Sequence, residues 1–237
     1  MLPAFSIVIP CFNEEARIGQ TLLVTLDYLA ANSPESELIV VNDGSTDATG
    51  AIAREGLKSA QVATRLLENF PNRGKGAAVR SGLLAARRPI GLFSDADLST
   101  PLEETPKLIE PIANGEVDIA FGSRAMDRRL IGVHQPWRRE QSGRIFNLLV
   151  RRASGLPFWD TQCGFKALRL EACRPILEAA RIEGFAFDVE LLYLAHRAGL
   201  RIREIPVRWN HAAGSKVSFF RDSIGMLREV IALRVNS

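Results

Sequence analysis

Short apolar runs alternate with longer amphipathic or small-residue segments along the first half of the chain. The apolar runs have the length of strands, and the segments between them have helical periodicity or lead through a polar turn into a helix. This alternation predicts an α/β fold, with a mostly parallel central sheet and helices on both faces. The predicted strands cover 5–9, 37–41, 62–67, 90–93 and 117–121, and the predicted helices cover 14–31 and 74–86.

Polar residues mark two further helix starts. Ser45 or Thr46 is expected to cap a helix after the second strand, because a hydroxyl oxygen at that position accepts a backbone N–H. Thr100, Pro101 and Glu103 have the spacing of a capping box that opens another helix.

The second half of the chain is less regular. Its apolar spacing predicts amphipathic helices, a strand, and a polar turn that leads into another strand. No linker separates the two halves, so we expect a single domain over 1–237. The predicted helices cover 141–153, 188–198 and 219–235, the strand covers 201–207, and the turn covers 160–166.

Polar side chains follow four of the predicted strands. Glu14 comes after the first strand, Asp43 after the second, Asp95 and Asp97 after the fourth, and Arg124 after the fifth. In open α/β sheets, ligands bind outside the carboxyl ends of the strands. We therefore expect these side chains to converge on one ligand site.

The pair Asp95 and Asp97 brings two carboxylates to one strand end. Such a pair suits a hard divalent cation that also binds substrate phosphates. An acidic pair in a loop is more often a solvated turn or a helix cap, but the neighbouring polar clusters favour the metal site. The pair therefore suggests chemistry on a nucleotide diphosphate.

The charge of the chain is unevenly distributed. The formal net charge of the 237 residues is only +3, yet the segment 124–152 holds eight arginines against two acidic residues. The planar guanidinium suits phosphate recognition. A nucleic-acid surface would carry interleaved aromatic residues, and only Trp137 and Phe146 lie in this segment. We therefore expect no nucleic-acid partner, and an anionic membrane surface is the better second interpretation.

The remaining composition is that of an ordinary globular protein. Three cysteines without a CxxC pair indicate free thiols in a reducing compartment. The first residues lack the pattern of a signal peptide, and no run reaches the ~18 apolar residues of a spanning helix.

Four motifs in order resemble the family-2 glycosyltransferases of GT-A fold. They are SIVIPCFNEE (6–15), VNDGSTD (41–47), NRGKG (72–76) and DAD (95–97). Three motifs of the second half look like dolichyl-phosphate β-glucosyltransferases and their prokaryotic relatives. These are DTQCGFK (160–166), FAFDVELLY (185–193), and EIPVRW (204–209) with GSK (214–216). The dolichyl-phosphate mannose synthases share the first half but match the second half less well.

This resemblance implies a nucleotide-sugar donor. Asp43 would accept a hydrogen bond from the base or ribose, and Lys75 would approach the base or a phosphate. Asp97 would ligate Mg²⁺ or Mn²⁺, and Asp95 would join it or hold the ribose. Ser99 stands where a third metal ligand is found in the mannose synthases, although its hydroxyl is a weak ligand. The residues expected to bind the donor are Pro10, Phe12, Glu14, Asp43, Lys75, Asp95, Ala96 and Asp97.

The resemblance also implies a polyprenyl phosphate acceptor. Its second pKa is about 6, so the attacking oxygen is already anionic and needs no general base. Attack from behind the anomeric carbon would invert the donor linkage. Asp160 and Gln162 would shape the sugar pocket or the loop beneath it. The residues expected to carry the transfer, through the metal or the two phosphates, are Asp97, Arg124, Arg138, Arg139 and Lys216.

The function expected from the resemblance is inverting, metal-dependent transfer of glucose from UDP-glucose to polyprenyl or dolichyl phosphate. Residues 1–122 would hold the nucleotide and 123–237 the acceptor. The enzyme would dock peripherally on the cytoplasmic face of a membrane through the basic helix at 138–152 and the terminal helix. A GDP-mannose donor or a saccharide hydroxyl acceptor stays open as an alternative, as does assembly into a homo-oligomer. A sugar-nucleotide nucleotidyltransferase and an inactive sugar-nucleotide-binding protein fit the motifs less well.

Overall fold

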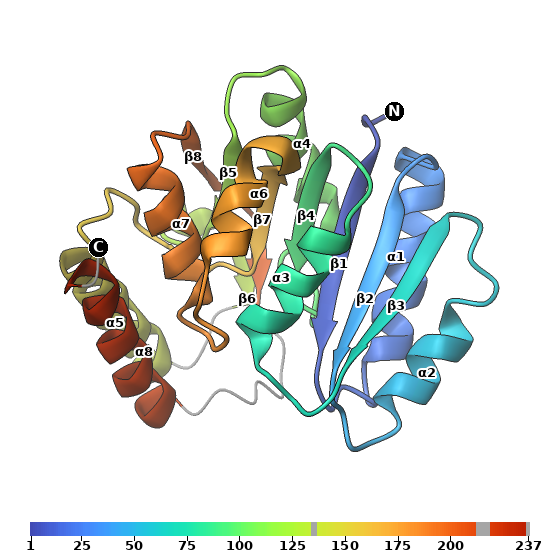
Figure 1. Ribbon diagram of the computed structural model, residues 1–237, viewed down its shortest axis with the longest axis horizontal. Coiled ribbons are helices and arrows are strands. Elements are labelled where there is room, and N and C mark those ends of the chain that lie inside the picture. The colour runs from blue at the N-terminus through green and yellow to red at the C-terminus, as the bar shows by residue number, and fades with distance from the viewer. Residues whose placement is uncertain (134–136, 212–218, 236–237) are drawn as a thin grey trace.

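A computed structural model describes residues 1–133, 137–211 and 219–235, with the backbone alone for 137–140, 144, 219–224 and 235. Its centre is a seven-stranded sheet of order β3-β2-β1-β4-β7-β5-β8, covered by helices (Figure 1). The strands are β1 (Phe5–Cys11), β2 (Glu37–Asp43), β3 (Ala63–Asn69), β4 (Ile90–Ser94), β5 (Ile119–Ser123), β7 (Phe165–Arg169) and β8 (Ile202–Pro206). A separate two-stranded sheet pairs β6 (Ile131–Val133) with β9 (Trp209–Asn210).

The strands β1, β2 and β4 are buried along almost their whole length because both faces of the sheet are covered. In β1, Ile7 and Ile9 face one core cluster, whereas Val8 between them faces the other. This alternation follows from the two-residue period of a strand. The first cluster is covered by α1 (Ile18–Asn32), α2 (Thr49–Gly56) and α4 (Thr105–Ala113), and the second by α3 (Lys75–Ala85), α5 (Trp137–Ser154), α6 (Leu170–Ala179), α7 (Phe187–Arg197) and α8 (Phe219–Val235).

Small residues let α3 approach the sheet closely. A Cβ atom added at Gly82 would lie 2.3 Å from Cγ1 of Val8, so no larger residue fits there without displacing the strand. The close approach places the amino-terminal end of α3 beside the carboxyl ends of β1 and β2 (Figure 1).

The predicted helix and strand segments are all present, with boundaries that differ by a few residues at several ends. Three features differ. Helix α6 was not predicted, and β7 runs antiparallel between β4 and β5. The small sheet of β6 and β9 was not predicted either.

Both predicted helix caps are wrong. Helix α2 begins at Thr49, and its N–H donates to the Asp47 carboxylate at 2.9 Å, whereas Ser45 accepts from the N–H of Asn13. Thr100 is buried, with its hydroxyl 3.9 Å from the Cys163 sulfur, because a 3₁₀ turn over Leu102–Glu104 intervenes before α4. In both cases a tertiary partner takes the hydroxyl that was expected to cap.

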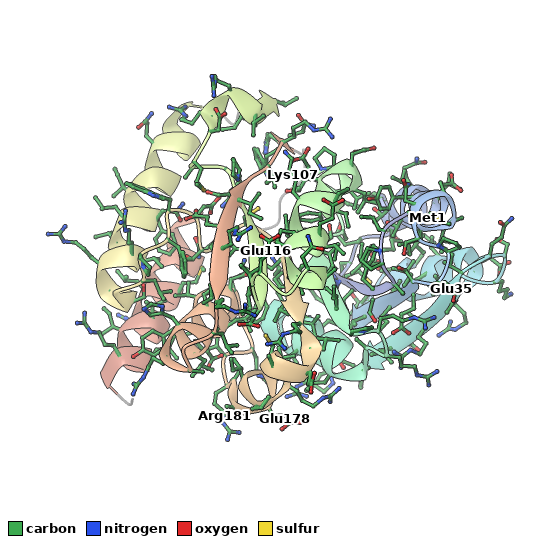
Figure 2. All side chains as sticks on the ribbon, turned by 90° about the horizontal axis from the view of Figure 1, so that it is seen from above. Met1, Glu35, Lys107, Glu116, Glu178 and Arg181 are labelled. Atoms are coloured by element: carbon green, nitrogen blue, oxygen red, sulfur yellow. The ribbon has the colours of Figure 1, made fainter. Side chains whose placement is uncertain are left out.

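The two ends of the sheet differ in character. Figure 2 looks onto the end where the parallel strands begin, with Met1, Glu35 and Glu116 at this end. Their carboxyl ends face the opposite way, toward the lower edge in Figure 1. Within the described ranges, no helix combines the length and the apolar character that crossing a bilayer requires.

Candidate active site

A cleft of about 1200 Å³ lies at the carboxyl ends of β1, β2, β4 and β5. Helices α5, α7 and α8 contribute to its other walls through Phe146, Asp188 and Met226. The structure thus confirms that the polar strand ends converge. Ten predicted residues line this cleft, namely Pro10, Phe12, Glu14, Asp43, Lys75, Asp95, Ala96, Asp97, Ser99 and Arg124.

The acidic pair sits on a tight turn that follows β4. The N–H of Asp95 donates to the carbonyl of Gly164 at 3.1 Å, and the N–H of Ser99 donates to Oδ1 of Asp97 at 2.9 Å. Leu98, which lies between Asp97 and Ser99, has φ +47°, a left-handed conformation that a leucine rarely adopts. The turn therefore holds both carboxylates at the cleft by specific backbone contacts.

Lys75 forms an ion pair with one member of the acidic pair, Asp95. As the first residue of α3 it places Nζ 2.7 Å from Oδ1 of Asp95 and 3.8 Å from Oδ2 of Asp188. Burial alone would lower the pKa of Lys75, but the two carboxylates outweigh it and raise that pKa above its ordinary value. The ammonium is therefore charged at neutral pH.

The Asp43 carboxylate is buried and holds the loop that precedes α3. It accepts hydrogen bonds from the side-chain amides of Asn69 and Asn72, each at 2.8 Å, and from the N–H of Gly74 at 2.7 Å. The N–H of Arg73 also lies 3.2–3.3 Å from its two oxygens. Asp43 therefore organises this wall of the cleft, and its contact with a nucleotide stays a prediction.

Arg124 forms a bidentate ion pair at the end of β5. Its Nε and one terminal nitrogen each lie 2.7 Å from an oxygen of Asp160, whose side chain is 1% exposed. Burial alone would raise the pKa of Asp160, but Arg124 outweighs it and lowers that pKa below its ordinary value. A guanidinium carries five N–H donors, so this pair leaves Arg124 able to hold an anion in the cleft.

The acidic pair fits a divalent cation of the magnesium type. Mg²⁺ is commonly held by one or two carboxylates, with substrate phosphates and water completing its shell. Oδ2 of Asp95 and Oδ2 of Asp97 accept no hydrogen bond from a described residue, so both oxygens are available. No group of three or more His, Cys, Asp or Glu residues suited to a metal occurs in the described part of the chain. With Ser99 alongside, the residues present match a site that substrate completes.

Three other predicted residues cannot be placed at the cleft. Arg138 and Arg139 lie in α5, where only the backbone of that turn is described, and Lys216 lies outside the described residues. Gln162 and Asp160 both line the cleft, and Asp160 is also the partner of Arg124.

The sequence interpretation did not foresee the buried ion pair between Lys166 and Asp188 beside the site. Lys166 is fully buried, and its Nζ lies 2.6 Å from Oδ1 of Asp188. Lys166 stands in the otherwise apolar stretch GFKAL, and Asp188 stands in FAFDVEL, where Glu190 is the one other charged residue. A charge flanked by core residues indicates burial with a partner, so the signal was present, although the sequence does not show which residues pair.

We expect Gly164→Ala to lower the activity of this site by about a hundredfold, because a misplacement of about 1 Å at a reacting group has that effect. A Cβ atom at Gly164 would lie 2.0 Å from Oδ2 of Asp95, so the carboxylate that pairs with Lys75 would have to move. Initial rates of the reaction measure this. Gly184→Ala is the matched control, since it also lines the cleft but has nothing within 4 Å of the added Cβ. Equal rates for the two variants would contradict the expectation.

Comparisons with known proteins agree with this geometry. Residues 6–177 match the sequence model of Glycosyl transferase family 2. Dolichyl-phosphate beta-glucosyltransferase of Saccharomyces cerevisiae is 34% identical over 97% of this chain and 74% of its own length. The Drosophila melanogaster protein of the same name is 37% identical over the same shares. Glycosyltransferase AglD of Haloferax volcanii is 34% identical over 95% of this chain, but over only 36% of its own length.

Solved structures show the same architecture. Glucosyl-3-phosphoglycerate synthase from Mycobacterium tuberculosis, in complex with Mn²⁺, UDP and phosphoglyceric acid, matches with a TM-score of 0.69 and 25% identity. The match covers 98% of this chain and 78% of that chain. The same enzyme with Mg²⁺ and UDP gives a TM-score of 0.69 at 24% identity. The predicted GT-A fold is thereby confirmed, and together with the family match and the curated relatives it shows that this chain belongs to glycosyltransferase family 2 and is a glycosyltransferase.

Proposed function

We propose that the enzyme transfers glucose from UDP-glucose to a polyprenyl or dolichyl phosphate, with inversion and with Mg²⁺ or Mn²⁺. The observation that carries this proposal is the division of charge in the cleft. Asp95 and Asp97 lie at the end of β4, and the arginines Arg124, Arg128 and Arg151 line the cleft elsewhere. A cation site next to a basic surface suits two phosphates, one of the donor and one of the acceptor.

The donor would bind over the carboxyl ends of β1, β2 and β4. Pro10 and Phe12 would line the nucleoside pocket, with Phe12 40% exposed and ready to be covered by a base. Asp95 and Asp97, with Ser99 beside them, would hold the cation, which when bound would neutralise the diphosphate leaving group. Relatives named dolichyl-phosphate beta-glucosyltransferase support glucose as the sugar, and the related synthase that binds Mn²⁺ and UDP supports the metal and the uridine nucleotide.

The acceptor side supports a nucleophile that arrives already ionised. Asp160 is paired with Arg124, and Asp188 with Lys166. Neither carboxylate is placed to remove a proton, because each already balances a buried or half-buried cation. A saccharide hydroxyl would need such a base, whereas a phosphate monoester would not. This favours a polyprenyl phosphate over a sugar hydroxyl as the acceptor.

Inversion is the stereochemical outcome that we expect from this proposed arrangement. With the diphosphate at the acidic pair and the acceptor phosphate held by Arg124 and its neighbours, the acceptor oxygen attacks the anomeric carbon opposite the departing UDP. An α-linked donor then gives a β-linked lipid product. In this scheme residues 1–122 supply the donor site and residues 123–237 supply the acceptor site.

Helix α5 presents an apolar surface that suits docking on a membrane. Ile145, Leu148 and Leu149 are 62%, 55% and 44% exposed, and Arg151 lies close by on the same helix. Ile145 and Leu148 also line the cleft, so a lipid chain leaving the site would meet apolar side chains. We propose peripheral binding to the cytoplasmic face of a membrane, with α8 packed against α5 (Figure 1).

We expect the protein to float with vesicles that contain anionic lipid. The double variant Ile145→Glu/Leu148→Glu should bind about tenfold more weakly, because it removes apolar burial and adds repulsion. Flotation on a density gradient measures the bound fraction. Leu23→Glu/Val24→Glu is the matched control, since these residues are exposed on α1, a helix packed on the other face of the sheet. Docking through α5 would be refuted if both double variants floated equally well.

The proposed function is tested by offering the enzyme polyprenyl phosphate with labelled UDP-glucose or GDP-mannose, each with Mn²⁺ or with a chelator. The expected result is labelled lipid in the reaction that contains UDP-glucose and Mn²⁺, and in none of the other three reactions. Label from GDP-mannose would change the donor assignment, and transfer to an oligosaccharide but not to the lipid would overturn the acceptor.

A further inference from the structure

Four charged side chains form a line of alternating sign that runs from the cleft into the core. Asp95 Oδ1 lies 2.7 Å from Lys75 Nζ, which lies 3.8 Å from Asp188 Oδ2, and Asp188 Oδ1 lies 2.6 Å from Lys166 Nζ. Exposure falls along this line, from 39% for the Asp95 side chain through 17% for Lys75 to 0% for Lys166.

The two distances to Asp188 decide how the charges are shared. Lys166 takes the short contact and also donates to the Cys163 carbonyl at 2.6 Å, so the innermost pair is complete without Lys75. The charge of Lys75 is consequently neutralised mainly by Asp95, the residue at the exposed end of the line. The ammonium of Lys75 therefore lies on one of the two carboxylates assigned to the cation.

We propose that Lys75 acts as an internal counter-ion that keeps a divalent cation off Asp95 until a diphosphate binds, and so couples metal binding to donor binding. This inference rests on the proposed function, because it concerns the same metal and nucleotide site. An ammonium and a divalent cation on one carboxylate repel each other strongly at such short range. A diphosphate supplies negative charge to both cations and removes the conflict.

The position of Lys75 in the fold supports this coupling. It is the first residue of α3, where the helix dipole disfavours a positive charge and favours an anion. The adjoining Gly74 has φ +109° and packs against the carbonyl of Glu183, which fixes the start of the helix. A phosphate that reached this helix end would lie within the range of the lysine, so the ammonium could turn from Asp95 to the phosphate without leaving its helix.

The variant Lys75→Met tests the inference by metal binding alone. Its fold should be kept, because Asp188 retains Lys166 and the exposed part of Asp95 can be solvated. Without nucleotide, we expect Mn²⁺ to bind at least about fivefold more tightly to Lys75→Met than to the wild type, since a competing cation is gone. The gain in Mn²⁺ affinity on adding UDP should shrink by about tenfold, because the repulsion that the diphosphate would relieve is already absent from this variant. Electron paramagnetic resonance of free Mn²⁺, with and without UDP, gives both numbers.

The control is Lys58→Met, which removes the same charge from an exposed residue paired with Glu55 just beyond α2 and should leave both quantities unchanged. Unchanged or weaker Mn²⁺ binding by Lys75→Met without UDP would overturn the inference and leave the proposed function standing. A wild-type protein that bound no Mn²⁺ even with UDP would instead overturn the metal assignment of the proposed function, and the inference with it.

Discussion

Replacing Asp97 by alanine is expected to lower transfer by about a thousandfold or more, because the cation that we propose it holds would stabilise leaving-group charge by several kcal/mol. Asp97 lines the cleft beside Asp95, and within the described part of the chain its Oδ1 alone accepts a hydrogen bond, from the N–H of Ser99 at 2.9 Å. The fold should be unaffected, since the turn that carries Asp97 keeps its backbone hydrogen bond from Leu98 to the Asp95 carbonyl. Initial rates at saturating Mn²⁺, with thermal unfolding of each variant, measure both effects.

A second variant separates charge from turn geometry. Asp97→Asn keeps an oxygen that can accept from Ser99, but it loses the negative charge. We expect it to be nearly as inactive as Asp97→Ala if the carboxylate holds the cation. Recovery of activity in Asp97→Asn would show that the turn alone matters. Asp27→Ala, at an exposed aspartate on α1, is the control for loss of one carboxylate.

Replacing Asp160 by alanine is expected to destabilise the protein by about 3 kcal/mol, the cost of leaving one partner of a buried ion pair unpaired. The change removes the acceptor of three donors of Arg124, including its backbone N–H at 2.9 Å. Urea unfolding measures the loss. Asp127→Ala is the matched control, because Asp127 holds Arg129 with the same bidentate geometry at the surface. We expect little change there, since exposed ion pairs contribute little.

The same pair determines how stability responds to acid. The pKa of Asp160 is lower in the folded protein than in the unfolded chain, so its stabilisation is complete above the ordinary aspartate value of about 3.9. It is lost as the pH falls through the lower, folded-state pKa. The difference in stability between the wild type and Asp160→Ala should therefore shrink below about pH 4. A difference that stayed constant down to the acid transition would contradict the depressed pKa.

Local patterns predicted most of the fold. The strands from β1 to β5 and the helices between them follow from the length and spacing of apolar runs, and the site follows from the rule that ligands bind at strand carboxyl ends. Asp95 and Asp97 could be singled out because they are adjacent in sequence to a clear strand. Their neighbours in the cleft could be named for the same reason.

Contacts between distant segments could not be predicted in this way. The partner of Arg124 is 36 residues away, and the partner of Lys166 is 22 residues away. Spacing along one element says nothing about such pairs. The orientation of β7 is also hidden, because an apolar run of five residues looks the same in either direction. The helix caps failed for the related reason that tertiary partners took Ser45 and Thr100.

The antiparallel β7 has a consequence for how such enzymes can change their substrates. This strand comes from the second half of the chain, yet it lies between β4 and β5 and so joins two strands of the first half. The residue directly before this strand, Gly164, also lies against Asp95. The two halves of the chain, which we propose to hold donor and acceptor, are therefore not interchangeable modules that could be exchanged by a crossover near residue 122. A new acceptor specificity would have to arise by substitutions around a shared sheet, with β7 inherited together with the proposed metal site that it supports.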